Sequence, residues 1–132
     1  MIILRRRILV VDDEEFVLFV LSSALKKLGS DVEIVTARNG SEALRRARQS
    51  PFDLLITDLR MPVMNGVQLT EAVRDLSPET AVIWMTAYGS YMAQADAERL
   101  GVRHCLDKPL TVGQIRQVAG EVLNGMGPDL LN

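Results

Sequence analysis

Residues 54–66 read LLITDLRMPVMNG, and this stretch indicates both the fold class and the position of a site. The first four residues are apolar or β-branched, which is typical of a strand covered on both faces of a sheet. The run ends in a single carboxylate, Asp58, and the chain then turns through Met61 and Pro62. A buried strand that places one charge at its tip predicts a site at the end of that strand.

The same alternation of patterns extends along the chain in both directions. Segments typical of buried strands are residues 8–11, 32–37, 54–57, 81–86 and 104–106. Segments with helical spacing of apolar residues are 16–28, 39–49, 67–76, 92–100 and 112–123. Asn39 and Thr111 stand where helix N-caps are expected, with Glu42 and Gln114 three residues later. Short loops between alternating strands and helices predict an α/β fold with a doubly wound, five-stranded parallel sheet.

Length and composition limit the classes of function. The 132 residues correspond to one domain, which we expect over residues 1–124, with 125–132 as a C-terminal tail or the start of a truncated linker. A net charge of −2 does not indicate nucleic-acid binding. One cysteine excludes an internal disulfide and a cysteine-built metal site. The longest apolar run, at 16–21, is too short to cross a membrane, and no signal-peptide pattern is seen, so we expect a cytoplasmic protein.

Polar residues follow four of the five predicted strands. They are Asp12 and Asp13 after the first strand, Asp58 after the third, Thr86 at the end of the fourth and Lys108 after the fifth. The carboxyl ends of parallel strands meet at one edge of a sheet, where ligands bind. Crowded carboxylates repel each other by roughly 4 kcal/mol per close pair at a protein-like dielectric. Lys108 offsets part of this repulsion, and the all-oxygen donor set predicts Mg²⁺ for the rest.

Each of these residues, taken singly, has an ordinary structural explanation. A lone aspartate after a strand is usually a loop or cap residue. An acidic pair before a helix often interacts with the helix dipole, and threonine is a good strand former. Four separate strands that all end in such residues make a shared site the better explanation.

Four motifs together resemble the receiver domain of bacterial two-component response regulators. They are VVDDE at 10–14, ITDLRMPVMNG at 56–66, MTAYGS at 85–90 and LDKP at 106–109. The resemblance covers about residues 7–123, and the second motif is the most specific of the four. It implies a flavodoxin-like fold with strand order 2-1-3-4-5.

The resemblance also implies a chemistry and a set of partners. Asp58 would accept a phosphoryl group from the phosphohistidine of a histidine kinase or phosphotransfer protein. The remaining roles fall to Asp12, Asp13, Asp58 and the backbone carbonyl of Arg60 as Mg²⁺ ligands, and to Thr86 and Lys108 as contacts of the phosphoryl oxygens. Such a domain assists its own phosphorylation and dephosphorylation but is not otherwise an enzyme. It signals to an output domain or target protein through its fourth helix, fifth strand and fifth helix, with no direct role for nucleic acid or membrane.

The chain departs from the family pattern at Cys105, three residues before Lys108, where Tyr or Phe is usual. A charge-assisted hydrogen bond from Thr86 contributes roughly 1.5–3 kcal/mol, whereas reversing a two-state population needs about 5.5 kcal/mol. We therefore expect a muted or altered conformational switch. The same departure leaves open an alternative, a phosphorylation-independent, receiver-like interaction module.

Other residues argue against two alternative functions and affect the expected lifetime of the phosphoryl group. An FMN site is not expected because DDEE at 12–15 would repel a phosphate, and Arg60 stands where an aspartyl-phosphate hydrolase would carry a second acid. Arg60 and Tyr88 are expected to flank the phosphoryl group and slow its hydrolysis. Phe19 is expected on the exposed face of the first helix, where it suits docking to a kinase or phosphotransfer helix. Arginines 5–7 are expected to lie in solvent.

Overall fold

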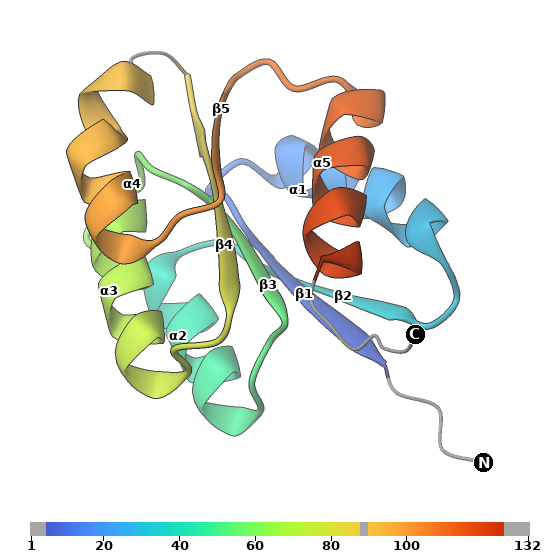
Figure 1. The fold of residues 1–132 in the computed structure, drawn as a ribbon, viewed down its shortest axis with the longest axis horizontal. Coiled ribbons are helices and arrows are strands. Elements are labelled where there is room, and N and C mark those ends of the chain that lie inside the picture. The colour runs from blue at the N-terminus through green and yellow to red at the C-terminus, as the bar shows by residue number, and fades with distance from the viewer. Residues whose placement is uncertain (1–4, 88–89, 126–132) are drawn as a thin grey trace.

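A computed structural model describes residues 5–87 and 90–125 as a doubly wound α/β fold (Figure 1). The strands are β1 (Arg6–Val11), β2 (Val32–Ala37), β3 (Leu54–Asp58), β4 (Ala81–Thr86) and β5 (His104–Asp107). The α-helices are α1 (Glu15–Leu25), α2 (Gly40–Gln49), α3 (Gly66–Leu76), α4 (Gln94–Leu100) and α5 (Val112–Asn124). Two 3-10 turns, η1 (Lys26–Leu28) and η2 (Ser90–Ala93), adjoin α1 and α4.

The five strands form one parallel sheet in the order β2-β1-β3-β4-β5, which confirms the predicted order. Helices α1 and α5 cover one face of the sheet, and α2, α3 and α4 cover the other (Figure 1). Alternate residues of a strand therefore enter different cores, as Ile8 and Leu9 of β1 do. Strands β3 and β4 are buried along their whole length, which explains their lack of polar alternation.

The helix ends follow the local capping chemistry. The Asn39 side chain accepts from the Glu42 N–H at 2.8 Å, and Thr111 accepts from the Gln114 N–H at 3.0 Å, so both predicted caps are present. The predicted helices 16–28 and 92–100 are shorter as α-helices than expected. Part of each is a 3-10 turn, and no side chain caps α4 at Ala93. Within the described residues, every helix is too short or too polar to cross a bilayer.

The expectation that arginines 5–7 lie in solvent is wrong for Arg7. Its side chain is only 24% exposed and pairs with Glu33 at 3.3 Å. Its Nη1 donates to the carbonyls of Ser50 at 3.1 Å and Pro51 at 2.9 Å, and its guanidinium lies 4.2 Å from the centroid of the Phe52 ring. The aromatic face and the loop carbonyls replace water around this cation.

Candidate functional site at the carboxyl edge of the sheet

The sheet brings three carboxylates from two strand ends together. Asp12 and Asp13 follow β1, and Asp58 is the last residue of β3. One oxygen of each lies within 4.8 Å of an oxygen of the other two. Asp12 is fully buried and Asp58 is 5% exposed, whereas Asp13 is exposed. The strand ends thus converge as predicted, and one of the three acids faces solvent.

Lys108 places a positive charge beside this cluster. Its Nζ lies 2.7 Å from Asp12 Oδ2 and 3.5 Å from Asp58 Oδ2. The loop after β5 holds it there, because the Lys108 N–H donates to the Thr86 carbonyl at 2.7 Å. The Lys108–Pro109 peptide that follows is cis. The ammonium group is therefore closer to Asp12 than to Asp58, and Asp58 is only partly neutralised.

The pKa of Asp58 is raised by burial, and the charge of Lys108 offsets this rise only in part. Burial raises the pKa of Asp58 above its ordinary value of 3.8; the charge of Lys108 opposes the rise and the charge of Asp12 adds to it. Burial alone would lower the pKa of Lys108, but its hydrogen bond to Asp12 and the charges of both carboxylates outweigh burial and raise it above 10.5. The site is short of positive charge, and its oxygen donors fit a hard divalent cation such as Mg²⁺.

Hydrogen bonds on three sides fix the backbone around Asp58. The Thr57 hydroxyl donates to the Asp58 carbonyl at 2.9 Å. The Leu59 N–H donates to the Met85 carbonyl of β4 at 2.9 Å, which continues the sheet by one residue. The Arg60 N–H lies 3.4 Å from Asp58 Oδ1. The carboxylate therefore projects from a rigid strand end into the acidic cluster.

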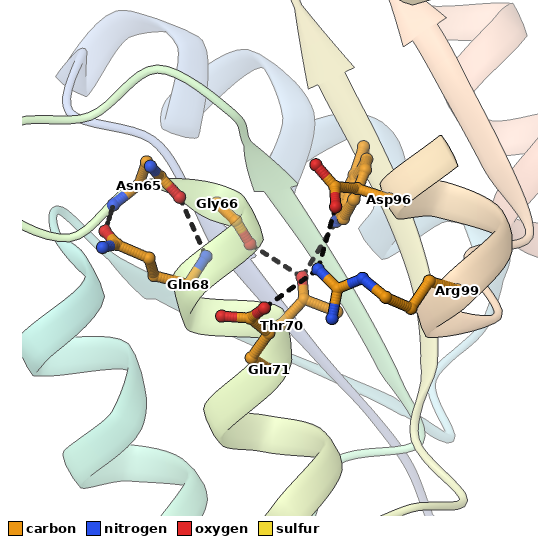
Figure 2. Close-up of polar contacts among 8 residues, drawn as sticks. Asn65, Gly66, Gln68, Thr70, Glu71, Asp96 and Arg99 are labelled. Atoms are coloured by element: carbon orange, nitrogen blue, oxygen red, sulfur yellow. Dashed lines mark hydrogen bonds and ion pairs between the residues drawn. The ribbon is translucent and has the colours of Figure 1, made fainter. Parts of the chain in front are cut away.

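The first turn of α3 packs directly on this loop. The Gly66 N–H donates to the Leu59 carbonyl at 3.0 Å, and a β-carbon at Gly66 would lie 2.4 Å from the Asp58 carbonyl oxygen. Only glycine allows so close an approach. A reciprocal capping box between Asn65 and Gln68 fixes the start of the helix (Figure 2). This box was not predicted from the sequence, although N-x-x-Q at 65–68 is its signature.

The other predicted residues differ in how far they are buried. Thr86 ends β4 and is 3% exposed, and the Arg60 side chain is exposed. Cys105 is half-buried and pairs in register with Trp84; burial, followed by the charge of Asp107, raises the pKa of its thiol. Tyr88 lies outside the described residues, so its effect on lifetime stays a prediction.

An apolar groove adjoins the acidic cluster. It has a volume of about 460 Å³ and lies between α1 and the loop after β5. Its lining includes Phe16, Val20, Met85, Pro109 and Leu110, with Lys108 linking it to the carboxylates. The exposure predicted for Phe19 is confirmed at 68%. Phe16, which is 76% exposed, was not predicted to be a surface residue of this kind.

Comparisons with known proteins agree with this geometry. A model of the response regulator receiver domain matches residues 8–119. The response regulator protein PilR of Pseudomonas aeruginosa is 33% identical over 125 residues, which are 95% of this chain but only 28% of PilR. A receiver domain structure from Clostridium thermocellum has a TM-score of 0.81 at 29% identity and covers 90% of this chain and 94% of its own.

A second solved structure is of TrrA from Thermotoga maritima, described in complex with Mg²⁺-BeF. It has a TM-score of 0.77 at 29% identity and covers 89% of this chain and 98% of its own. The match to both structures over nearly the whole described chain confirms the fold class predicted from the sequence.

Proposed function

Because this chain belongs to the response regulator receiver domain family, we propose that Asp58 accepts a phosphoryl group from the phosphohistidine of a histidine kinase or phosphotransfer protein. The observation that carries this proposal is the acidic cluster, in which oxygens of Asp12, Asp13 and Asp58 lie within 4.8 Å of one another. The cluster fits the phosphoacceptor site of a two-component signalling domain.

Asp58 has the properties of the nucleophile. Phosphoryl transfer needs an in-line oxygen and positive charge around the spreading equatorial oxygens, and a carboxylate needs no general base. One Asp58 oxygen forms the new bond to phosphorus as the bond from phosphorus to the donor nitrogen breaks. The electron pair of that bond returns to the imidazole. The rigid end of β3 keeps the carboxylate in place for this attack.

Mg²⁺ is the cation that we assign to the cluster, held by Asp12, Asp13, Asp58 and the backbone carbonyl of Arg60. The oxygen-only donors and the shortage of positive charge support this assignment. When bound, the ion supplies charge that stabilises both the carboxylates and the transferring group. The Mg²⁺-BeF complex described for TrrA gives further support.

Lys108 and Thr86 are the residues that we assign to the phosphoryl oxygens. Lys108 already lies 3.5 Å from Asp58 and can reach a group bonded to it. Thr86 is buried at the end of β4, and its carbonyl accepts the Lys108 N–H, so the two residues are positioned together. Both donate hydrogen bonds to developing negative charge, which assists phosphorylation and later hydrolysis.

The apolar groove is the surface that we assign to the phosphodonor. An amphipathic helix of a kinase or phosphotransfer protein can lay its apolar face in the groove, against Phe16, and can contact Phe19, which is exposed on the same helix but does not line the groove. The groove meets the acidic cluster at Lys108, so a histidine on such a helix would lie next to Asp58. Since the chain spans 28% of PilR, we further propose that it controls an output domain or target protein.

The alternative, a phosphorylation-independent interaction module, is not favoured. An interaction module needs no buried carboxylates, and burying them is costly. Here Asp12 is fully buried and Asp58 is 5% exposed, and the chain provides one lysine, Lys108, as the charge partner of both. A chain that keeps this costly arrangement is better explained by phosphorylation than by partner binding alone.

Mass spectrometry after incubation with acetyl phosphate and Mg²⁺ tests the proposal. The wild type should gain about 80 Da, the mass of one phosphoryl group. Asp58→Asn should gain nothing, and Asp75→Asn, on the exposed side of α3, should behave as the wild type. An equal adduct on Asp58→Asn would place the acceptor elsewhere, and no adduct on the wild type would restore the alternative.

A further inference from the structure

Thr70 is a polar residue in the buried face of α3 and is fully inaccessible to solvent. Its hydroxyl donates to the Gly66 carbonyl one turn earlier at 2.8 Å, as Figure 2 shows. The same hydroxyl accepts from the indole Nε1 of Trp84, which is also fully buried, at 2.9 Å. One hydroxyl group thus joins the first turn of α3 to strand β4.

Packing alone does not explain a hydroxyl at this position. Thr70 lies on the buried face of α3 beside the apolar residues Leu69 and Val73. Valine has the same shape and avoids the cost of burying a polar group, and a threonine hydroxyl bonded to the carbonyl four residues earlier slightly weakens a helix. The pair of hydrogen bonds offsets these costs, so the link between α3 and β4 is what the hydroxyl provides.

Both ends of this link are in contact with the backbone that carries the phosphoacceptor. Gly66 donates to the Leu59 carbonyl at 3.0 Å and packs on the Asp58 carbonyl, where a β-carbon would lie 2.4 Å away. Trp84 precedes Met85, whose carbonyl accepts the Leu59 N–H and which pairs in register with Asp58. The segment after β3 is therefore held between two elements that the Thr70 hydroxyl connects.

We propose that Thr70 is a positioning residue for Asp58, because its hydroxyl sets the distance between the start of α3 and β4 and so fixes the loop from Asp58 to Gly66. The inference rests on the proposed role of Asp58 as phosphoacceptor. Small displacements of a reacting group reduce rates strongly, and residues that orient a reacting group typically change activity by about 10- to 100-fold.

Three variants separate positioning from stability. Thr70→Val removes the hydroxyl and keeps the shape, and Thr70→Ser keeps the hydroxyl and removes a methyl group. Val73→Ala is the matched control, because Val73 lies on the same buried face of α3, 3% exposed, and its truncation destabilises the helix without touching the link. The readout is the rate constant for phosphorylation by acetyl phosphate with Mg²⁺, measured well below the unfolding transition of every variant.

The expected result is a rate about tenfold or more below the wild type for Thr70→Val, and within about twofold of it for Thr70→Ser and Val73→Ala. A rate for Thr70→Val equal to that of Val73→Ala would show that the hydroxyl acts only through stability and would overturn the proposal. If Thr70→Val does not fold, Trp84→Phe carries the test, since it removes the indole donor and should lower the rate in the same way.

Amide hydrogen exchange, without metal or phosphodonor, keeps this inference separate from the proposed function. The Leu59 and Gly66 amides should exchange about tenfold faster in Thr70→Val than in Val73→Ala. Unchanged exchange at both amides overturns the positioning role. A wild type that takes up no phosphoryl group refutes the proposed function, and the exchange result then decides the positioning role alone.

Discussion

In the metal-free protein, the buried charge of Asp58 lowers the free energy of unfolding. The carboxylate is 5% exposed and shares Lys108 with Asp12, to which the lysine lies closer. Because burial raises the pKa of Asp58 in the folded protein, the native state binds a proton on this carboxyl more tightly than the unfolded chain does. The protonated Asp58 carboxyl therefore stabilises the folded state. This contribution is complete at pH values below the pKa of the unfolded chain, near 3.8, and is lost as the pH rises through the pKa of the folded protein.

Asp58→Asn should therefore stabilise the metal-free protein, and the gain should grow as the pH rises. The free energy of unfolding of the two proteins should be similar at the acidic end of the range. It should favour the variant by on the order of 1 kcal/mol at neutral pH, because the amide has no charge to bury. Urea unfolding in a chelating buffer over a pH series measures this difference.

Added Mg²⁺ gives the matching control. At tenfold excess over the dissociation constant, a ligand that binds only the folded state stabilises it by about 1.4 kcal/mol. The wild type should show such a gain and Asp58→Asn a smaller one. A variant that is less stable than the wild type in chelator at neutral pH would contradict the electrostatic argument.

Gly66 offers a second test at the scale of one residue. Alanine is usually preferred over glycine inside a helix by about 1 kcal/mol, but here its β-carbon would lie 2.4 Å from the Asp58 carbonyl oxygen. Gly66→Ala should therefore destabilise by about 1–3 kcal/mol and slow phosphorylation. Gly113→Ala in α5 is the matched control, because a β-carbon there meets nothing within 4 Å. Chemical unfolding of both variants should give shifts of opposite sign; a stabilised Gly66→Ala would refute the close contact.

The individual residues of the site differ in how far the sequence could identify them. The carboxylates and Lys108 were predictable because each lies at or just after the end of a strand, and strand ends meet at one edge whatever the details of packing. The roles of Gly66 and Thr70 were not predictable, because they depend on how closely α3 approaches β3 and β4. Periodicity gives the face of a helix but not its distance from a sheet.

At the scale of elements, helix α1 presents two large aromatic side chains to solvent beside the apolar groove. Phe16 is 76% exposed and Phe19 is 68% exposed, although most of the remaining apolar residues of α1 are wholly or partly buried. Amphipathic helices normally direct such residues inward. Phe16 lines the groove that meets the acidic cluster at Lys108, and Phe19 is exposed on the same helix, so the two rings fit a docking surface.

Phe16→Ala and Phe19→Ala should each slow phosphotransfer from a histidine kinase by about tenfold, because aromatic residues at the centre of an interface contribute most of its binding energy. Phosphorylation by acetyl phosphate should not change, since the small donor needs no docking surface. Met92→Ala, 76% exposed on η2, is the matched control. Equal losses with both donors would show that the two phenylalanines affect the site itself and not the docking of a partner.

The elements themselves were predicted well, and the errors lie at their ends. All five strands and five helices are where hydrophobic periodicity indicated, because β-branched runs and helical stripes are local signals. Residues 26–28 and 92–93 are in 3-10 turns, which apolar spacing cannot separate from a terminal α-helical turn. The start of α3 was placed one residue late because its capping box was missed.

At the scale of the whole molecule, the unusual residue is Cys105, which carries a small side chain on β5 next to Trp84 of β4. No large side chain at this position can rotate in response to phosphorylation. The hydrogen bond available from Thr86 falls short of the free energy needed to reverse a conformational population. The surface formed by α4, β5 and α5 should therefore respond weakly.

Amide NMR spectra before and after phosphorylation should show shifts that are largest around Asp58 and small over α4, β5 and α5. Cys105→Tyr should enlarge the shifts on that surface, because a ring there can move between buried and exposed positions. Cys105→Ser, which keeps the size of the side chain, should not. Large shifts confined to α4, β5 and α5 in the wild type would refute the muted switch.

The overall architecture followed from the alternation of strands and helices, and the strand order came from the resemblance of the motifs to a known family. The misjudged charge was Arg7, because a run of arginines normally indicates a solvated surface. The aromatic ring of Phe52 and the carbonyls that hold Arg7 come from segments more than forty positions away in the sequence. No local pattern reports such a contact.

The indole bonded to Thr70 has a practical consequence, because Trp84 is the single tryptophan of the chain. Fluorescence excited selectively at the indole of the unlabelled protein therefore originates at one known point between the sheet and α3. A change in the wavelength or intensity of this emission on adding metal or phosphodonor would show, in real time, whether metal binding or phosphorylation at the carboxyl edge of the sheet alters the packing around Trp84.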